Sequence, residues 1–436
     1  MIDAKHLALT EELLSWIAKA PTAYQTVEQV ESALMDAGYE QLAERDMWHL
    51  RTGGKYYVVR NGSSLIAFRV PKQPATSFLI SAAHTDSPAF KLKEQSQQTV
   101  CTAYVRLNTE VYGGTIFSSW LDRPLSVAGR LIIRDGNRIF SKTVCIQRDL
   151  LLIPSVAIHQ NRGVNDGIRC DPANDTLPLW SMSADAPSVR QLVAQAAQVR
   201  QEDILSQDLY VYNRMPGTVF GADDAFFAAP RIDDLMCVFA CLRGFLNSTD
   251  VAAFPVYAIF DNEETGSATK QGAGSFFLRD VLQRICDAFN LLLPRALACS
   301  MMVSADNGHA RHPNHPELSD PDNAPLLNGG VVLKSNAAQR YATDGMSFAV
   351  FSEICRRAQV PVQLFANRSD MPGGSTLGSI SNTLVPLCTV DLGAAQLAMH
   401  AAYETAGCVD VWYLAKALQA FFQSRLLPCE NGFILE

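Results

Sequence analysis

The chain has 436 residues, of which 48% are hydrophobic and 18% are charged, and its formal net charge is −8. This length predicts two or three domains with enough material for a large core, and the composition is that of an ordinary globular protein. The pI near 5.5, together with a sequence that contains no dense Lys/Arg patch, argues against a nucleic-acid partner.

The amino-terminal sequence lacks the apolar core of a secretory signal, and no stretch approaches about 20 uninterrupted apolar residues. The best candidate, around residues 291–303, is interrupted by Pro294 and Arg295. The eleven cysteines include no Cys-x-x-Cys pair, and several lie in apolar segments, as Cys237 does. This pattern indicates reduced, buried thiols, and we expect a cytoplasmic protein that has no membrane partner.

Apolar residues at helical spacing predict helices from Leu7 to about Gly38, with a break at Ala20–Pro21. From about 95 to 225, short β-like runs with polar or Gly punctuation predict a β-rich segment, in which residues 171–201 are interpreted as a loop or insertion. A helix is predicted over 235–246. Apolar runs typical of buried strands occur at 55–60, 64–70, 77–83, 254–260, 296–305 and 383–390.

The alternation of helices with short apolar strands predicts the α/β class, with a mixed sheet covered by helices on both faces. We expect a catalytic domain made of residues 1–94 and 231–436. The β-rich residues 95–230 then form an inserted domain that serves oligomerisation or substrate binding.

Side chains that can bind metals stand at the ends of predicted strands or at the start of a predicted helix. They are His84 and Asp86 after the strand at 77–83, Asp233 and Asp234 at a helix start, Glu263 and Glu264 after 254–260, Asp306 after 296–305, and His400, placed in a predicted helix after 390–393. Because the carboxyl ends of strands in an open α/β sheet meet at one edge, these distant residues can share one site.

Two histidines with three or more carboxylates suit a two-zinc centre, in which one carboxylate bridges ions about 3.5–4 Å apart. A carboxylate that is not a ligand can accept a proton and pass it to the leaving amine, and the pair Glu263 and Glu264 supplies this division of labour. Asp86 is placed to hold the second ring nitrogen of His84. Each element alone also has a structural interpretation; Asp233–Asp234, for example, would be favourable at any helix N-terminus.

Seven motifs, in order along nearly the whole chain, resemble those of the aspartyl aminopeptidase family, a group of two-zinc exopeptidases. They are Ser81–Lys91, Ile153–Arg162, Ala229–Asp234, Phe260–Ser267, Ser304–Asn314, Gly373–Gly378 and Met399–Gly407. The resemblance implies a zinc-exopeptidase-like fold and hydrolysis of unblocked amino-terminal Asp or Glu from peptides. It also implies that dimers assemble into tetrahedral dodecamers.

The resemblance further assigns roles to individual residues. It implies that His84, Asp233 and Asp306 bind one zinc, that Asp233, Glu264 and His400 bind the other with Asp233 as the bridge, and that Glu263 is the general base. His159 would reach the active site of a neighbouring subunit and steady the oxyanion, Lys334 would meet the acidic side chain of the substrate, and His309 and Tyr341 would contact the substrate. Carboxylate-rich sites also accept manganese or cobalt.

Some features leave alternatives open. The family usually has Asp-Asn where this chain has Asp233-Asp234, so the identity of the bridging carboxylate is open, and residues 171–201 match the family poorly. Lys334 or Arg340 could instead hold a substrate α-carboxylate, which keeps a two-zinc carboxypeptidase or deacylase as an alternative, beside an aminopeptidase of broader specificity. A non-enzymatic shell is disfavoured because the ligand set is complete.

Overall fold

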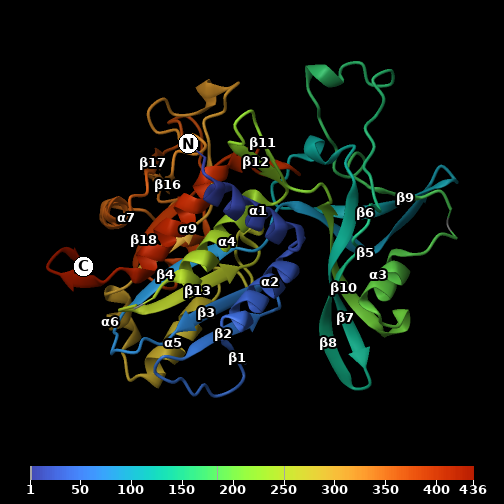
Figure 1. Cartoon of the computed structure of the whole chain (residues 1–436). Coiled ribbons are helices and arrows are strands. Elements are labelled where there is room, and N and C mark those ends of the chain that lie inside the picture. The colour runs from blue at the N-terminus through green and yellow to red at the C-terminus, as the bar shows by residue number, and fades with distance from the viewer. Residues whose placement is uncertain (1, 184, 250) are drawn as a thin grey trace.

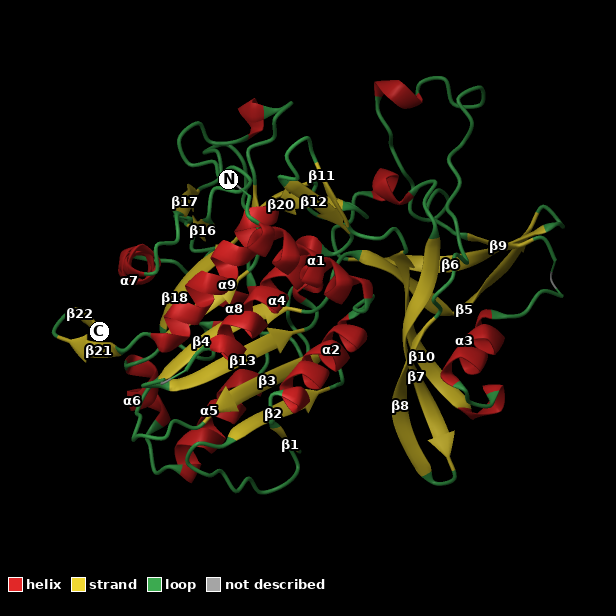
Figure 2. Ribbon diagram, in the orientation of Figure 1, coloured by secondary structure: helices red, strands yellow, loops and turns green. Residues whose placement is uncertain are grey.

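The computed structural model describes residues 2–183, 185–249 and 251–436. Figures 1 and 2 show a large body built on a nine-stranded sheet and, beside it, a body built on a long antiparallel sheet. The predicted mixed α/β architecture, with helices on both faces of the main sheet, is confirmed. Within these residues we find no helix with both the length and the apolar character of a membrane span.

The main sheet has the strand order β1-β2-β3-β13-β4-β14-β18-β16-β17. The strands are β1 (Glu40–Leu42), β2 (Lys55–Arg60), β3 (Ser64–Arg69), β4 (Phe78–His84), β13 (Phe254–Phe260), β14 (Met301–Ala305), β16 (Val331–Lys334), β17 (Val362–Phe365) and β18 (Cys388–Gly393). The neighbours β13, β4, β14 and β18 are parallel. Their carboxyl ends therefore meet at one edge of the sheet.

Two hydrophobic clusters cover the two faces of this sheet, and alternate residues of the same strands enter each. Helices on one face are α1 (Ala4–Ala18), α2 (Ala23–Asp36), α4 (Ile232–Asn247), α7 (Gly345–Arg357) and α9 (Cys408–Gln423). Helices on the other are α5 (Phe277–Ala288), α6 (Leu293–Ala298) and α8 (Leu377–Ser381). Helix α4 is buried on nearly all sides, since it packs against both the sheet and α9.

The second body is an antiparallel sheet of order β8-β7-β10-β5-β6-β9, against which α3 packs. Its elements are β5 (Ala89–Val100), β6 (Tyr104–Tyr112), β7 (Leu125–Asp135), β8 (Arg138–Cys145), β9 (Leu179–Ser181), α3 (Val189–Ala197) and β10 (Ile204–Asn213). Short 3-10 turns occur at Phe117–Trp120, Val164–Asp166, Gln201–Asp203, Glu263–Thr265 and Pro316–Leu318.

A five-stranded sheet of order β11-β12-β20-β19-β15 joins segments that are distant in sequence. Its strands are β11 (Thr218–Phe220), β12 (Phe226–Ala229), β15 (Gly308–His309), β19 (Ala395–Leu397) and β20 (Glu404–Gly407), and a hairpin of β21 (Leu426–Cys429) and β22 (Gly432–Leu435) ends the chain. The division into domains at residues 94/95 and 230/231 stays a prediction.

Several expectations about single elements were wrong. The strand expected over 296–305 starts only at Met301, because Pro294 lies in the first turn of α6, a favoured place for proline. Residues 171–201 are not one loop, since they contain β9 and α3, and α3 begins with a capping box at Ser188. The strand expected over 383–390 begins only at Cys388.

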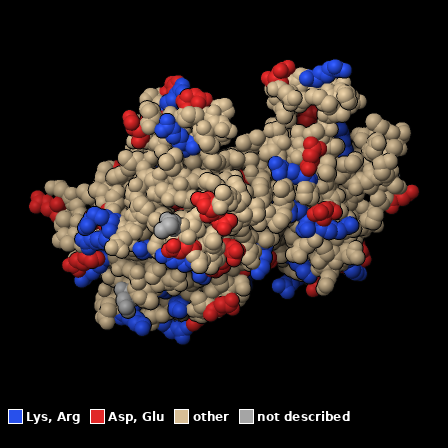
Figure 3. Space-filling model, turned by 45° about the horizontal axis from the view of Figure 1, so that its top comes forward, with Lys and Arg blue, Asp and Glu red and all other residues tan. Residues whose placement is uncertain are grey.

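The space-filling view in Figure 3 shows acidic and basic side chains interspersed on one face of the molecule. No single sign of charge dominates that face. This distribution is unlike the clustered basic surface typical of proteins that bind nucleic acids.

Candidate metal centre

The carboxyl edge of the main sheet gathers the side chains that can bind metals. His84 is the last residue of β4 and pairs in register with Phe260 at the end of β13. Glu263 and Glu264 lie in the 3-10 turn just beyond β13, and Asp306 directly follows β14. These residues come together because β13, β4 and β14 are adjacent parallel strands that all end at this edge.

The potential ligand atoms form overlapping groups, within each of which all the atoms lie within 4.8 Å of one another. The groups are His84 with Asp233, Asp234 and Asp306; Asp233 with Glu264 and His400; and His84 with Glu263 and Glu264. Asp233 stands between the two histidines, because its Oδ1 lies 3.4 Å from Nε2 of His84 and its Oδ2 lies 3.4 Å from Nε2 of His400. One carboxylate thus faces both imidazoles.

The expectation that His400 lies in a helix was wrong. His400 lies in the turn between β19 and β20 and has a φ of 67°. Its main-chain N–H donates to Oε1 of Glu404 (2.8 Å), and Oε2 of the same carboxylate accepts from the N–H of Asp233 (3.0 Å). Glu404 therefore fixes the backbone of two residues of the cluster at once.

Both imidazoles turn Nε2 toward Asp233 because their Nδ1 atoms are held by main-chain carbonyls. Nδ1 of His84 lies 3.0 Å from the carbonyl oxygen of Asp86, and Nδ1 of His400 lies 3.1 Å from that of Gly114. Such a contact fixes the tautomer and the ring orientation of a metal-binding histidine. The nearer partner of His84 is thus the carbonyl of Asp86, not its carboxylate, which stands 3.5 Å away.

The carboxylate of Asp86 instead orders the neighbouring turn. It accepts hydrogen bonds from the main-chain N–H groups of Glu263 and Glu264, both at 3.2 Å. It also accepts one from the hydroxyl of Tyr112 at 2.6 Å. Asp86 therefore connects the end of β4 to the turn that carries both glutamates.

The donor set fits zinc. Within the described part of the chain, three buried carboxylate oxygens have no hydrogen-bond partner: Asp233 Oδ1, Asp234 Oδ1 and Glu264 Oε1. Burial, followed by neighbouring carboxylates, raises the pKa of Asp234 and Glu264 well above their ordinary values. Burial acts the same way on Asp233, but the His400 and His84 imidazoles, 3.4 Å away, hold its pKa below the ordinary value. A cation coordinated by these nitrogen and oxygen atoms would relieve the repulsion.

Glu263 lies beside the ligand groups and is partly buried. Burial, aided by the charges of Asp306 and Asp86, raises the pKa of Glu263 to about 8. A carboxylate with a pKa near neutrality is well suited to accept and return a proton. Because Glu263 lies next to His84 and Glu264, it can accept and return a proton within the cluster.

Lys334 lies beside Asp306 and is only 2% exposed. Its Nζ donates to the carbonyl of Asn307 (3.0 Å) and lies 3.3 Å from Oδ1 of Asp306. Burial favours the neutral amine, yet the Asp306 carboxylate holds the pKa of Lys334 above its ordinary value. The Tyr341 ring lies 5.3 Å from Nζ, and the rings of Tyr341 and His309 both pack edge-on against Phe365.

His159 lies elsewhere. It is exposed in the long connection between β8 and β9, which projects from the antiparallel sheet at the top of Figure 1. Among the described residues, no hydrogen bond or ion pair joins it to the metal cluster of the same chain.

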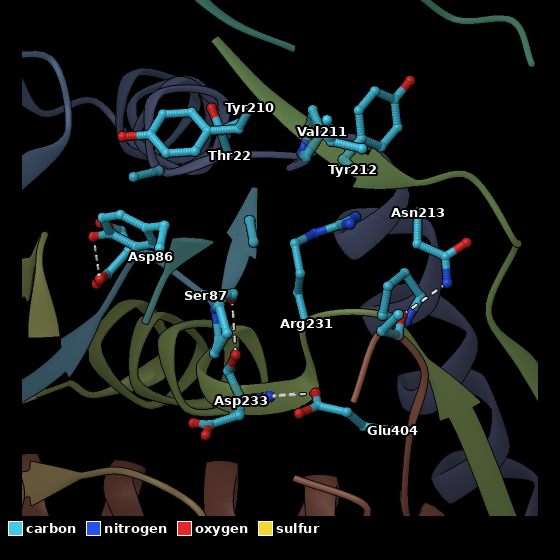
Figure 4. A pocket seen from close by; sticks show the side chains of 18 of the residues that line it. Thr22, Asp86, Ser87, Tyr210, Val211, Tyr212, Asn213, Arg231, Asp233 and Glu404 are labelled. Carbon is cyan, nitrogen blue, oxygen red and sulfur yellow. Dashed lines mark hydrogen bonds between the residues drawn. The ribbon is translucent and has the colours of Figure 1, made fainter. Parts of the chain in front are cut away.

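Sequence reasoning missed Glu404, Tyr112 and Gly114. Glu404 lies inside the motif Met399–Gly407, so its acidic side chain within that motif was the available signal. Tyr112 and Gly114 follow no ligand-like spacing. Figure 4 shows a cavity of ≈ 50 Å³ that is lined by Asp86, Asp233 and Glu404 together with Arg231 and Tyr210.

A largely buried group of histidines and carboxylates at the carboxyl edge of a mixed α/β sheet is an arrangement typical of metal-dependent hydrolases. A family model described as "Aminopeptidase I zinc metalloprotease (M18)" matches residues 16–422. The chain therefore belongs to the M18 family of zinc metallo-aminopeptidases.

Individual proteins agree with this assignment. The chain is 40% identical over 427 residues to a probable M18 family aminopeptidase 2 of Clostridium acetobutylicum, covering 95% of this chain and 99% of that protein. It is 38% identical to a protein of the same name from Streptomyces coelicolor, covering 95% and 97%. The solved mApe1 dodecamer of S. cerevisiae superposes with a TM-score of 0.84 at 28% identity, covering 95% of this chain and 96% of that chain.

Proposed function

We propose that this M18 enzyme uses two zinc ions per chain to remove unblocked amino-terminal Asp or Glu from peptides. The observation that carries the two-ion centre is the placement of Asp233, whose two carboxylate oxygens each face the Nε2 atom of a different histidine at 3.4 Å. A carboxylate shared in this way is suited to bridge two ions.

In this proposal, His84, Asp233 and Asp306 hold one ion, and Asp233, Glu264 and His400 hold the other. Asp234 is the rival bridge, but its Oδ2 accepts from the main-chain N–H of His84 (3.2 Å), and it belongs only to the first ligand group. Asp233 is therefore the better supported bridge. Manganese or cobalt can replace zinc at such a site.

Bound zinc would polarise the scissile carbonyl and activate water. The protein itself contributes orientation and proton transfer. Asp86 holds the main chain of Glu263 in place, and Glu263 accepts a proton and delivers it to the leaving amine. Asp86 thus acts on catalysis indirectly, through the position of Glu263.

Lys334 is the proposed selector for acidic side chains, with Tyr341 and His309 nearby as further substrate contacts. Two acceptors already lie near its Nζ, and an ammonium has three donors, so one N–H is available to a substrate carboxylate. Because that bond is charge-assisted and largely desolvated, it is worth more than a neutral hydrogen bond.

Cleavage of reporter peptides with amino-terminal Asp, Glu, Leu and Lys tests the specificity. We expect efficient, metal-dependent cleavage of the Asp and Glu peptides only. Efficient cleavage of Leu or Lys would instead support an aminopeptidase of broader preference. Cleavage of carboxy-terminal reporters, with none of the amino-acylated reporters, would replace the proposal by a two-metal carboxypeptidase or deacylase.

Replacing Lys334 with Met is expected to lower kcat/KM for acidic peptides by about 10- to 150-fold, the equivalent of a lost charged hydrogen bond of about 1.5–3 kcal/mol. The same variant should change cleavage of a slow neutral peptide by less than about threefold. Because Lys334 also contacts Asp306, zinc content is measured alongside. Equal losses on acidic and neutral peptides, with zinc retained, would reject Lys334 as the selector.

We further propose that the chain forms a homo-oligomer, a dodecamer as mApe1 does, that its dodecamer is built from dimers, and that His159 acts in the site of a neighbouring subunit. Its exposed position beside the apolar side chains of Val156 and Ile158, which are 55% and 47% exposed, supports a role at an interface.

A cytoplasmic location accords with free thiols, several of them buried, such as Cys237 and Cys355.

Replacing His159 with Ala is expected to lower kcat by about 10²–10³-fold, the cost of losing one oxyanion donor, without changing zinc content. Co-expression of the H159A and E263Q chains should restore part of the activity, because mixed oligomers contain sites with an intact Glu263 and a His159 from the neighbour. Restoration is measured against each variant alone. An unaffected kcat in H159A, or co-expressed chains no more active than the variants, would remove the role in a neighbouring site.

A further inference from the structure

The end of β6 and the residues after it extend from the antiparallel sheet to the metal cluster. We propose that residues 112–116 position the metal-binding side chains from outside the ligand set, with Tyr112 as the positioning residue. This inference rests on the proposed metal centre. It adds that a segment of the second body, the one built on the antiparallel sheet, helps to hold that centre in place. Neither the ligand set nor the base includes any of these residues.

Tyr112 connects Asp86 and Asn262, the two residues that hold the 3-10 turn carrying Glu263 and Glu264. Its hydroxyl donates to Oδ2 of Asp86 at 2.6 Å and accepts from Nδ2 of Asn262 at 2.9 Å. Asp86 in turn accepts from the N–H groups of Glu263 and Glu264, as described above. Asn262 precedes that turn in a left-handed conformation, with a φ of 63°. The hydroxyl therefore ties Asp86 to the residue that begins the turn.

The residues that follow Tyr112 hold His400. The carbonyl of Gly114 accepts from Nδ1 of His400, and the main-chain N–H of Ile116 donates to the carbonyl of His400 at 3.0 Å. The hydroxyl of Thr115 lies 3.3 Å from the same carbonyl and accepts from Nε1 of Trp120 at 2.7 Å. Both the ring and the backbone of His400 are thus set by this segment.

Gly113 brings the same segment against Glu264. It has a φ of +72°, and a Cβ added there would stand 3.0 Å from Cβ of Glu264. Only glycine takes that conformation at no cost and allows so close an approach. The segment therefore packs against Glu264 and hydrogen-bonds to His400. These are the two side chains proposed to hold one ion together with Asp233.

These contacts predict that residues 112–116 set the geometry of the proposed metal ligands. Partners of this kind, one step removed from the metal, change metal affinity or activity by about 10- to 100-fold when they are removed. Tyr112 is the informative position, because its hydroxyl touches Asp86 and Asn262 but no proposed ligand.

The test compares Tyr112→Phe with Tyr210→Phe in the full-length metal-loaded protein. Tyr210 is a matched control: it lines the same cavity and its ring packs edge-on against Tyr112 at 5.5 Å. Among the described residues, the Tyr210 hydroxyl makes no hydrogen bond. We measure the rate of zinc release to a chelating indicator, the visible spectrum of the cobalt-substituted protein, and kcat and KM separately.

For Tyr112→Phe we expect zinc release about tenfold faster, an altered cobalt spectrum, and a kcat about 10- to 100-fold lower with KM within about threefold. For Tyr210→Phe we expect all of these, and the thermal unfolding temperature, to stay close to those of the unmodified protein, with the rates within about twofold, and both variants should remain folded. Unchanged zinc release and cobalt spectrum in Tyr112→Phe would overturn the proposal. Equal effects in the two variants would also overturn it, since they would show a general packing effect of the cavity.

The metal readouts separate this inference from the proposed function. Zinc release and the cobalt spectrum do not depend on which peptide is cleaved. If acidic peptides prove not to be the substrates, the comparison of Tyr112→Phe with Tyr210→Phe still decides whether residues 112–116 position the metal ligands.

Discussion

Replacing Glu263 with Gln is expected to lower kcat by about 10²–10⁴-fold while zinc stays bound. Glutamine keeps the size and most of the hydrogen-bonding capacity of the side chain, but its amide cannot accept a proton at neutral pH. The main-chain support from Asp86 to residue 263 would be unchanged, because it involves only the N–H group. The loss therefore isolates proton transfer from metal binding.

The matched control is the neighbouring change Glu264→Gln. Glu264 belongs to the ligand group of Asp233 and His400, so this variant should bind less metal as well as turn over more slowly. Zinc per chain and kcat are measured for both variants with an amino-terminal Asp peptide. Near-normal kcat in E263Q would reject Glu263 as the base, and metal loss in E263Q with retention in E264Q would reverse the two roles.

Removing the metals is expected to abolish activity and to lower the thermal unfolding temperature. Ions that bind only the folded state stabilise it by about 4 kcal/mol when their free concentration is 1,000 times Kd. Without ions, the buried carboxylates of Asp233, Asp234 and Glu264 keep oxygens that have no hydrogen-bond partner in the described structure. Repulsion among these groups adds to the loss.

The measurement follows unfolding temperature and cleavage rate after dialysis against a chelator, and again after zinc or cobalt is restored. Magnesium is the control, because it prefers octahedral oxygen ligands and keeps its waters, and should restore little. An unfolding temperature that is the same with and without zinc would show that the ions contribute nothing to folding. Full activity in the chelated protein would contradict metal-dependent catalysis.

Most of the cluster could be located from the sequence because His84, Glu263, Glu264 and Asp306 each follow a mainly apolar run. Such runs mark buried parallel strands, and their ends share an edge. The exact start of the strand before Asp306 was less predictable, since an apolar run does not distinguish the end of α6 from the start of β14.

The surroundings of His400 were misjudged for a different reason. The residues around it have no strong period, and their structure depends on pairing of β20 with β12, where Glu404 lies opposite Ala229. A partner 175 positions away in the chain (404 − 229 = 175) leaves no local pattern. Local propensity therefore favoured a helix where the sheet required a turn.

The chemistry of the centre can be predicted from residue types and their order along the chain: which possible ligands are present, that they follow strands, and that a further carboxylate stands beside them. How these groups are held in place depends on contacts between segments that are distant in sequence. The hydroxyl of Tyr112 reaches Asp86 across 26 positions, and the carbonyl of Gly114 reaches His400 across 286. Every residue has a carbonyl and many have a hydroxyl, so their use in orienting a metal ligand depends on packing between two sheets and has no signature along the chain.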